Sequence, residues 1–139
     1  MTRSDTGRID VFFYGLFMDE ALLREKGTNP RNRRLAALEN FQLVIAQRAT
    51  LVPSQDHVVH GVVFSLTHDE LDRLYADPSV KEYRPEAVLA KLADGNAIPC
   101  LTFNLPGLNA NEQRNHAYAE KLRALAADLN LPPSYVETI

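Results

Sequence analysis

The sequence predicts an α+β domain built on a small, mixed, largely antiparallel β-sheet or barrel with peripheral helices. Short segments rich in β-branched and aromatic residues recur along the chain, as is typical of strands. Their connections are mostly short turns, and Asp94-Gly95 is the clearest hairpin signal among them. Helical patterns are few and do not alternate regularly with the strands, which argues against a doubly wound parallel sheet.

The N-terminal part predicts one strand followed by one short helix. Ile9–Tyr14 is rich in β-branched and aromatic residues, and Gly15 ends this strand. Asp19 can cap a helix that extends to Lys26, and Gly27 suits the C-terminal cap of that helix.

The middle of the chain predicts three strands separated by polar connections. The strands are Phe41–Ala46, Ala49–Val52 and Val58–Leu66, and the connections are the polar loop 28–34 and the turn Ser54–Asp56. Gly61 interrupts the third strand, where a glycine often marks a bulge or a close backbone approach.

The remaining elements are two helices, one hairpin and an apolar tail. Thr67 and Glu70 form a capping box, and the helix that follows cannot run past Asp77 because Pro78 disfavours helical geometry before it. The hairpin strands are Glu86–Ala93 and Ala97–Phe103, the last helix spans 112–129 with a stripe of Tyr118, Leu122, Leu125 and Leu129, and the tail 131–136 is expected to dock on the core.

Length and charge indicate one domain, residues 9–139, behind a flexible N-terminal arm of residues 1–8. The net charge of −3 argues against nucleic-acid binding, because proteins that bind nucleic acid normally carry a basic excess. No apolar run reaches the ~18 residues of a membrane span, and the polar N-terminus lacks a signal-peptide core. We therefore expect a cytoplasmic protein, monomeric or weakly dimeric, without a membrane partner.

Metal chemistry is not expected from this sequence. The single cysteine, Cys100, excludes an intramolecular disulfide and a cysteine-rich metal site. His57 and His60 fall on opposite faces of a strand, so they cannot chelate one metal without a bulge.

Three motifs follow one another in a fixed order. Phe13-Tyr14-Gly15 closes the first strand, Gly61-Val62-Val63-Phe64 precedes the capped helix, and Tyr83-Arg84 leads into the hairpin strands. Together with the closing segment Leu131–Val136, this order resembles the γ-glutamylcyclotransferase-like family over residues 9–136.

The resemblance implies a small mixed barrel and an intramolecular reaction without metal or cofactor. In that family the α-amine of a γ-glutamyl group attacks its own γ-carbonyl, which releases 5-oxoproline and an amine or amino acid. Backbone N–H groups hold the anionic end of the substrate, and one carboxylate moves the proton. The implied partner is therefore a small γ-glutamyl-type ligand.

By this resemblance Tyr14, Gly15, Leu16 and Phe17 form the substrate cradle, and Tyr83 forms part of the pocket wall. Leu16 and Phe17 stand where the family usually has small polar residues, so a more apolar pocket and a different or bulkier substrate are expected.

The catalytic carboxylate is the main departure, because Pro78 stands where the family places its glutamate. Asp77 lies one position early and has a shorter side chain, and Glu82 directly precedes Tyr83. Both carboxylates stay candidates for proton transfer.

Three functions follow from these observations. The first is γ-glutamyl cyclotransfer, and the second is a non-catalytic small-molecule-binding module with the same fold. A carboxylate facing the cavity beside Gly15 distinguishes the two. The third is a protein-interaction domain that uses the basic segment Arg31–Arg34.

Overall fold

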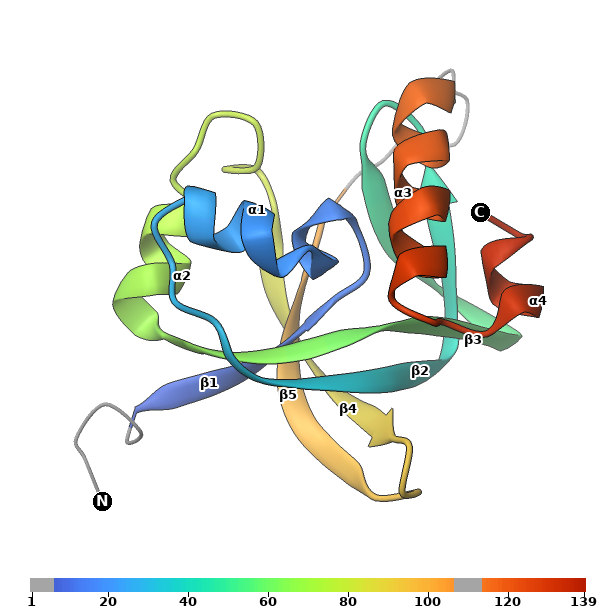
Figure 1. The fold of residues 1–139 in the computed structure, drawn as a ribbon, viewed down its shortest axis with the longest axis horizontal. Coiled ribbons are helices and arrows are strands. Elements are labelled where there is room, and N and C mark those ends of the chain that lie inside the picture. Colours follow the sequence, from blue (N-terminus) through green and yellow to red (C-terminus); the bar gives the residue numbers. More distant parts are fainter. Residues whose placement is uncertain (1–6, 107–113) are drawn as a thin grey trace.

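The computed structural model describes residues 7–106 and 114–139 and shows a closed five-stranded barrel with the strand order β1–β3–β2–β4–β5 (Figure 1). The parallel pair β1–β5 closes it, and all other neighbouring strands are antiparallel. This confirms the predicted fold class. The strands are β1 (Arg8–Phe13), β2 (Arg31–Ile45), β3 (Ala49–Thr67), β4 (Arg84–Leu92) and β5 (Ala97–Asn104).

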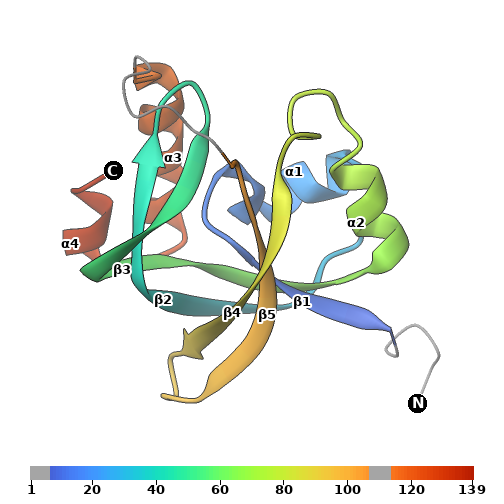
Figure 2. The same ribbon diagram turned by 180° about the vertical axis from the view of Figure 1, so that it is seen from behind.

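The helices gather into two groups beside the barrel (Figures 1 and 2). Helices α1 and α2 lie together on one side of the barrel, and α3 and α4 lie together on the opposite side. The helical segments are η2 (Leu16–Met18, a single 3-10 turn), α1 (Glu20–Glu25), α2 (His68–Leu74), α3 (His116–Asp128) and α4 (Pro133–Val136).

The longest element is the β2–β3 hairpin, and here the predicted boundaries were wrong. Residues 31–34 of the predicted polar loop belong to β2, and the predicted turn Ser54–Asp56 lies inside a continuous β3. The pairing of β2 with β3 shifts register between Glu39 and Phe41. The residues opposite this shift are 54–57 of β3, and Asp56 among them adopts a positive φ of 67°. A bulge of this kind bends the ribbon without ending it, so two predicted strands are one.

Other local predictions are confirmed. The Asp19 side chain caps α1, and Thr67 and Glu70 form the predicted capping box of α2. A Cβ on Gly61 would lie 2.3 Å from the backbone oxygen of Phe13, so this glycine permits the close approach of β3 to β1. The predicted start of the last helix at Glu112 lies outside the described residues, and α3 begins at His116 after the cap Asn115.

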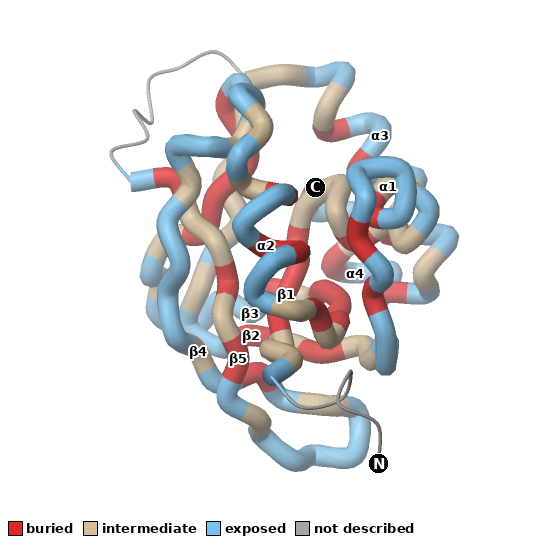
Figure 3. The backbone as a smooth tube through the Cα atoms, turned by 90° about the vertical axis from the view of Figure 1, so that its left-hand side faces the viewer, coloured by how far each residue is buried: buried red, intermediate tan, exposed pale blue. Residues whose placement is uncertain are grey.

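The core fills the barrel and extends beneath the C-terminal helices (Figure 3). Phe12, Val63 and Phe64 from β1 and β3 are almost completely buried, as is Leu122 of α3. The C-terminal segment packs onto the same cluster, as predicted, since Leu131, Tyr135 and Ile139 are buried there.

Two seams of the barrel carry few pairs. β1 and β5 meet at Val11 and Leu101, and β4 meets β2 at Leu92 and Lys91. From Arg84 to Ala90, β4 is paired with β5.

The predicted N-terminal arm lies largely outside the described residues, and Arg8 is the first residue of β1. No helix in residues 7–106 and 114–139 is both long and apolar enough to cross a membrane.

Candidate ligand-binding site

An aromatic cavity of about 240 Å³ opens where β1 ends. The end of β1, η2, the β2–β3 turn, the loop after α2, β5 and α3 all contribute to its wall. The loop after α2 and the β2–β3 turn lie on the same side of the barrel, at the top of Figures 1 and 2. Eight of the lining residues are aromatic: Phe12, Phe13, Tyr14, Phe17, Tyr75, Tyr83, Phe103 and Tyr118.

The structure brings together the five residues that the sequence predicts to contact a substrate. Two of them are fixed by hydrogen bonds to the backbone: the Tyr14 hydroxyl donates to the carbonyl oxygen of Phe103 at 2.7 Å, and the Tyr83 hydroxyl to that of Ala49 at 2.5 Å. Both rings are therefore held as rigid parts of the wall. The five residues in the lining are Tyr14, Gly15, Leu16, Phe17 and Tyr83.

The loop that begins at Gly15 is in close contact with Tyr118 of α3. A Cβ atom on Gly15 would lie 2.6 Å from the Tyr118 hydroxyl oxygen. The backbone of Leu16 also acts on the Tyr118 hydroxyl, since it works against the burial that raises the pKa of Tyr118. The Tyr118 side chain therefore covers part of the backbone loop that was predicted to hold the anionic end of a ligand.

The tyrosines of the wall are neutral at physiological pH. Burial raises the pKa of Tyr14, Tyr75 and Tyr118. Burial also raises the pKa of Tyr83 to about 12, although Arg48 and the bond to Ala49 work in the other direction. These side chains therefore offer rings and hydroxyl groups to a ligand, and none of them acts as an anionic base.

Asp77, the first candidate base, is not part of the cavity lining. Its carboxylate accepts hydrogen bonds from the backbone N–H and the hydroxyl of Ser79, and it lies 3.5 Å from the Lys26 ammonium. The bonds from Ser79, together with Lys26, lower the pKa of Asp77. A carboxylate with a lowered pKa is a poorer proton acceptor.

Glu82, the second candidate base, is exposed and is also absent from the lining of the cavity. Its carboxylate lies 3.2 Å from a guanidinium nitrogen of Arg48, which does line the cavity. Among the described residues, no aspartate or glutamate lines this cavity.

Several residues of the wall carry no local motif that predicts them as part of a site, among them Arg48, Tyr75, Phe103 and Tyr118. Tyr118 was predicted as part of the apolar stripe of the last helix, and that pattern does not distinguish a core position from a cavity wall. No local motif marks Arg48. It reaches the site because the barrel places the β2–β3 turn beside the loop after α2, where Arg48 meets Glu82.

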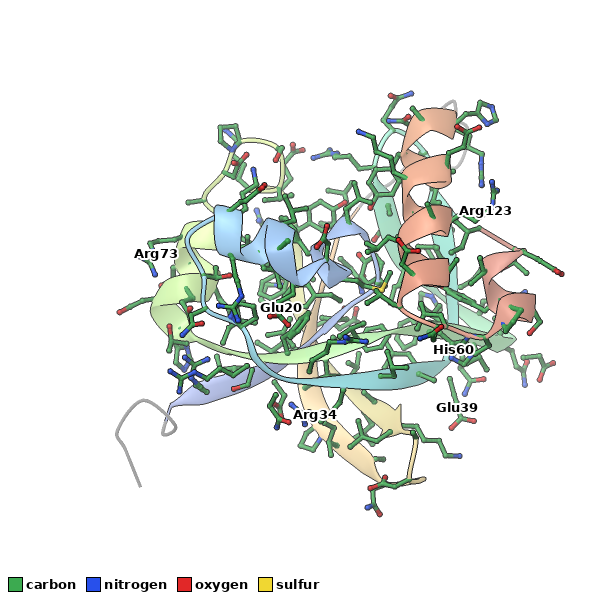
Figure 4. All side chains as sticks on the ribbon, in the orientation of Figure 1. Glu20, Arg34, Glu39, His60, Arg73 and Arg123 are labelled. Carbon is green, nitrogen blue, oxygen red and sulfur yellow. The ribbon has the colours of Figure 1, made fainter. Side chains whose placement is uncertain are left out.

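Within the described part of the chain, no three His, Cys, Asp or Glu side chains lie close enough together to hold a metal ion. His57 and His60 line a separate groove beside α4, and Figure 4 labels His60 there. The His60 ring contacts Tyr135 with 5.1 Å between ring centres. Burial lowers the pKa of His60.

A known protein family matches most of this chain. The sequence model described as "Gamma-glutamyl cyclotransferase, AIG2-like" matches residues 11–122. No curated protein matches the chain.

Solved structures share the fold at low sequence identity. An uncharacterized human protein superposes with a TM-score of 0.76 at 22% identity, covering 95% of this chain and 86% of its own. A protein titled gamma-glutamyl cyclotransferase gives a TM-score of 0.74 at 20% identity, covering 94% and 85%. An AIG2-like protein from Mus musculus gives 0.56 at 20% identity, covering 73% and 80%.

Proposed function

Because the chain belongs to the gamma-glutamyl cyclotransferase, AIG2-like family, we propose that it keeps the family's pocket as a binding site for a small, largely apolar molecule. In this proposal the protein does not turn its ligand over. The observation that carries the proposal is the aromatic cavity, whose described lining contains no carboxylate to move a proton. Cyclotransfer requires such a group, because the attacking amine must lose a proton and the leaving nitrogen must gain one.

The cavity suits a ligand of modest size. A cavity of about 150 Å³ lined by apolar side chains is sufficient to bind benzene. The cavity of this protein is larger, about 240 Å³, and its walls are rings that bury planar groups well. One ring with a short substituent therefore matches the available space.

Cyclotransfer of a γ-glutamyl group is the second candidate, and one observation favours it. Glu82 contacts Arg48, which lines the cavity, so a rotation of the Glu82 side chain is the route by which its carboxylate would reach a bound substrate. Asp77 is held by Ser79 and Lys26 and is the weaker candidate.

The first experiment measures 5-oxoproline by mass spectrometry after incubation with a panel of γ-glutamyl dipeptides and γ-glutamyl amines. The native protein, Glu82→Gln and Asp77→Asn are assayed side by side. We expect no 5-oxoproline above the protein-free background for any of the three. Product that is lost in one of the two variants would overturn the non-catalytic proposal and identify the base.

The second experiment measures binding by ligand-observed NMR with a panel of small aromatic acids, amides and alcohols. The chain has no tryptophan, and Leu16→Trp would fill the cavity from η2. Leu89→Trp makes the same change at an exposed position on β4 and is the matched control. Binding should be lost in Leu16→Trp and kept in Leu89→Trp, with both variants folded by circular dichroism. Equal binding by both variants would contradict the assignment of the site to this cavity.

A further inference from the structure

Arg48 is the one charged side chain among the described residues that line the cavity. It projects from the turn between β2 and β3, and its guanidinium carbon lies 6.0 Å from the centre of the Tyr83 ring. A cation beside an otherwise aromatic wall sets the sign of the charge that a ligand can carry at this end.

The present partners of Arg48 are weak competitors for it. One guanidinium nitrogen lies 3.2 Å from the Glu82 carboxylate and 3.5 Å from the Ser79 carbonyl oxygen. The side chains of Arg48 and Glu82 are 37% and 59% exposed. Exposed ion pairs contribute little net stability, so a ligand carboxylate can exchange with Glu82.

The other place for an anionic group, the backbone loop at Gly15, is already in use. The Tyr118 hydroxyl oxygen stands 2.6 Å from the position of a Cβ on Gly15. A ligand head group at this loop would first have to displace the Tyr118 ring. Arg48 is therefore the accessible anchor for a negative charge.

The aromatic part of the cavity wall is suited to a ring. Tyr75 stacks on Phe103 with 3.9 Å between ring centres and 14° between their planes, and the Phe17 ring lies nearly perpendicular to Tyr75 with 6.0 Å between ring centres. This packing gives a rigid aromatic wall, against which the ring of a ligand can pack.

From these contacts we infer that the ligand of the cavity is a small aromatic carboxylic acid whose ring packs on the Tyr75–Phe103 wall and whose carboxylate replaces Glu82 on Arg48. This inference rests on the proposed binding function and specifies its ligand class. No bond is made or broken, since the only exchange is between two carboxylates on one guanidinium.

The test uses one acid and its neutral counterpart, hydrocinnamate and hydrocinnamide, titrated calorimetrically into the full chain. A charged partner for the carboxylate predicts that the acid binds about tenfold more tightly than the amide. Arg48→Gln should remove this preference while leaving the affinity for the amide unchanged. Glu82→Gln frees Arg48 and should tighten binding of the acid without affecting the amide.

Glu39→Gln is the matched control, because it removes a glutamate that pairs with Lys91 and lies outside the cavity lining. It should leave the affinity for both compounds unchanged. If Arg48→Gln does not fold, the response to Glu82→Gln still decides the question.

Equal affinity for acid and amide, or an unchanged affinity for the acid in Glu82→Gln, would overturn the inference and leave the proposed binding function intact. Absence of binding across the whole aromatic panel would overturn the proposed function itself. The two failures are therefore distinguishable.

Discussion

The contact between Gly15 and Tyr118 requires glycine at position 15, because a Cβ atom does not fit beside the Tyr118 hydroxyl. Gly15 has a φ of −110°, which other residues adopt readily, so its backbone conformation does not demand glycine. The demand comes from the Tyr118 hydroxyl, which occupies the space of a side chain. The ring carbon that bears this hydroxyl lies 3.9 Å from the Cβ position, an ordinary contact distance.

We predict that Gly15→Ala destabilises the native protein by about 1–3 kcal/mol through overpacking. In a Tyr118→Phe background the clashing oxygen is gone, and the cost of the same substitution should fall below about 1 kcal/mol, a non-additivity expected for residues in contact. Urea unfolding of the four proteins measures this cycle. Additive free energies would show that the hydroxyl is not the source of the constraint.

The same residue scale explains what the sequence could reveal of the site. Tyr14, Gly15, Leu16 and Phe17 are contiguous, so a local motif was sufficient to place them together. Tyr118 comes from a distant helix, and its role depends on a contact that only the folded chain creates.

At the scale of elements, the N-terminus of α2 is a junction of three segments. The Glu70 carboxylate accepts from the Thr67 backbone N–H at 2.8 Å and from the backbone N–H of Asn29. The Arg8 guanidinium of β1 lies 3.8 Å away. Burial alone raises the pKa of Glu70, but the hydrogen bonds from Thr67 and Asn29 and the charge of Arg8 outweigh it, so the pKa is lowered from 4.5.

A group with a lowered pKa in the folded state stabilises the protein above its unfolded pKa, and this contribution is lost as the pH falls through the folded-state value. Glu70→Gln should therefore destabilise the protein by about 1–3 kcal/mol at neutral pH, because it leaves buried donors poorly paired. The deficit should shrink as the pH falls below 4.5.

Chemical unfolding at a series of pH values measures this difference between the two proteins. Asp69→Asn changes an exposed acid in the same first turn and controls for the helix dipole. A deficit that stays constant with pH would contradict the ionic role of Glu70.

Elements differed in how much of their structure local sequence could predict. The capping box of α2 and the Asp94-Gly95 hairpin are short-range features, and both were predicted correctly. The polar residues of the β2–β3 hairpin favour turns locally, but pairing along its length and a bulge near Phe41 keep them in strands. Long-range pairing is invisible to a pattern of a few residues.

At the scale of the whole molecule, the barrel closes through a small set of contacts between β1 and β5. One backbone pair joins Val11 and Leu101, and next to it the buried Thr102 hydroxyl donates to the Phe12 carbonyl oxygen at 2.9 Å. The neighbouring residues Phe12 and Phe103 line the cavity, so this seam also fixes the geometry of the candidate site.

Thr102→Val should destabilise the protein by about 1–3 kcal/mol, because it removes a buried donor while keeping the shape of the side chain. Thr102→Ser keeps the hydroxyl and loses one methyl group, so it separates the hydrogen bond from packing. Thermal and urea unfolding measure both effects. A smaller loss in Thr102→Val than in Thr102→Ser would contradict a role for this bond in closing the barrel.

The sparse seam between β2 and β4 has a consequence for behaviour at high concentration. From Arg84 to Ala90, β4 pairs with β5, and its other edge meets β2 only further on, at Lys91 and Leu92. A free strand edge is a template on which another chain can add and start aggregation. Proline and charged side chains are the means by which natural sheets discourage such pairing. Pro85 and Glu86 occupy this edge, and residues of these types discourage the addition of another chain there.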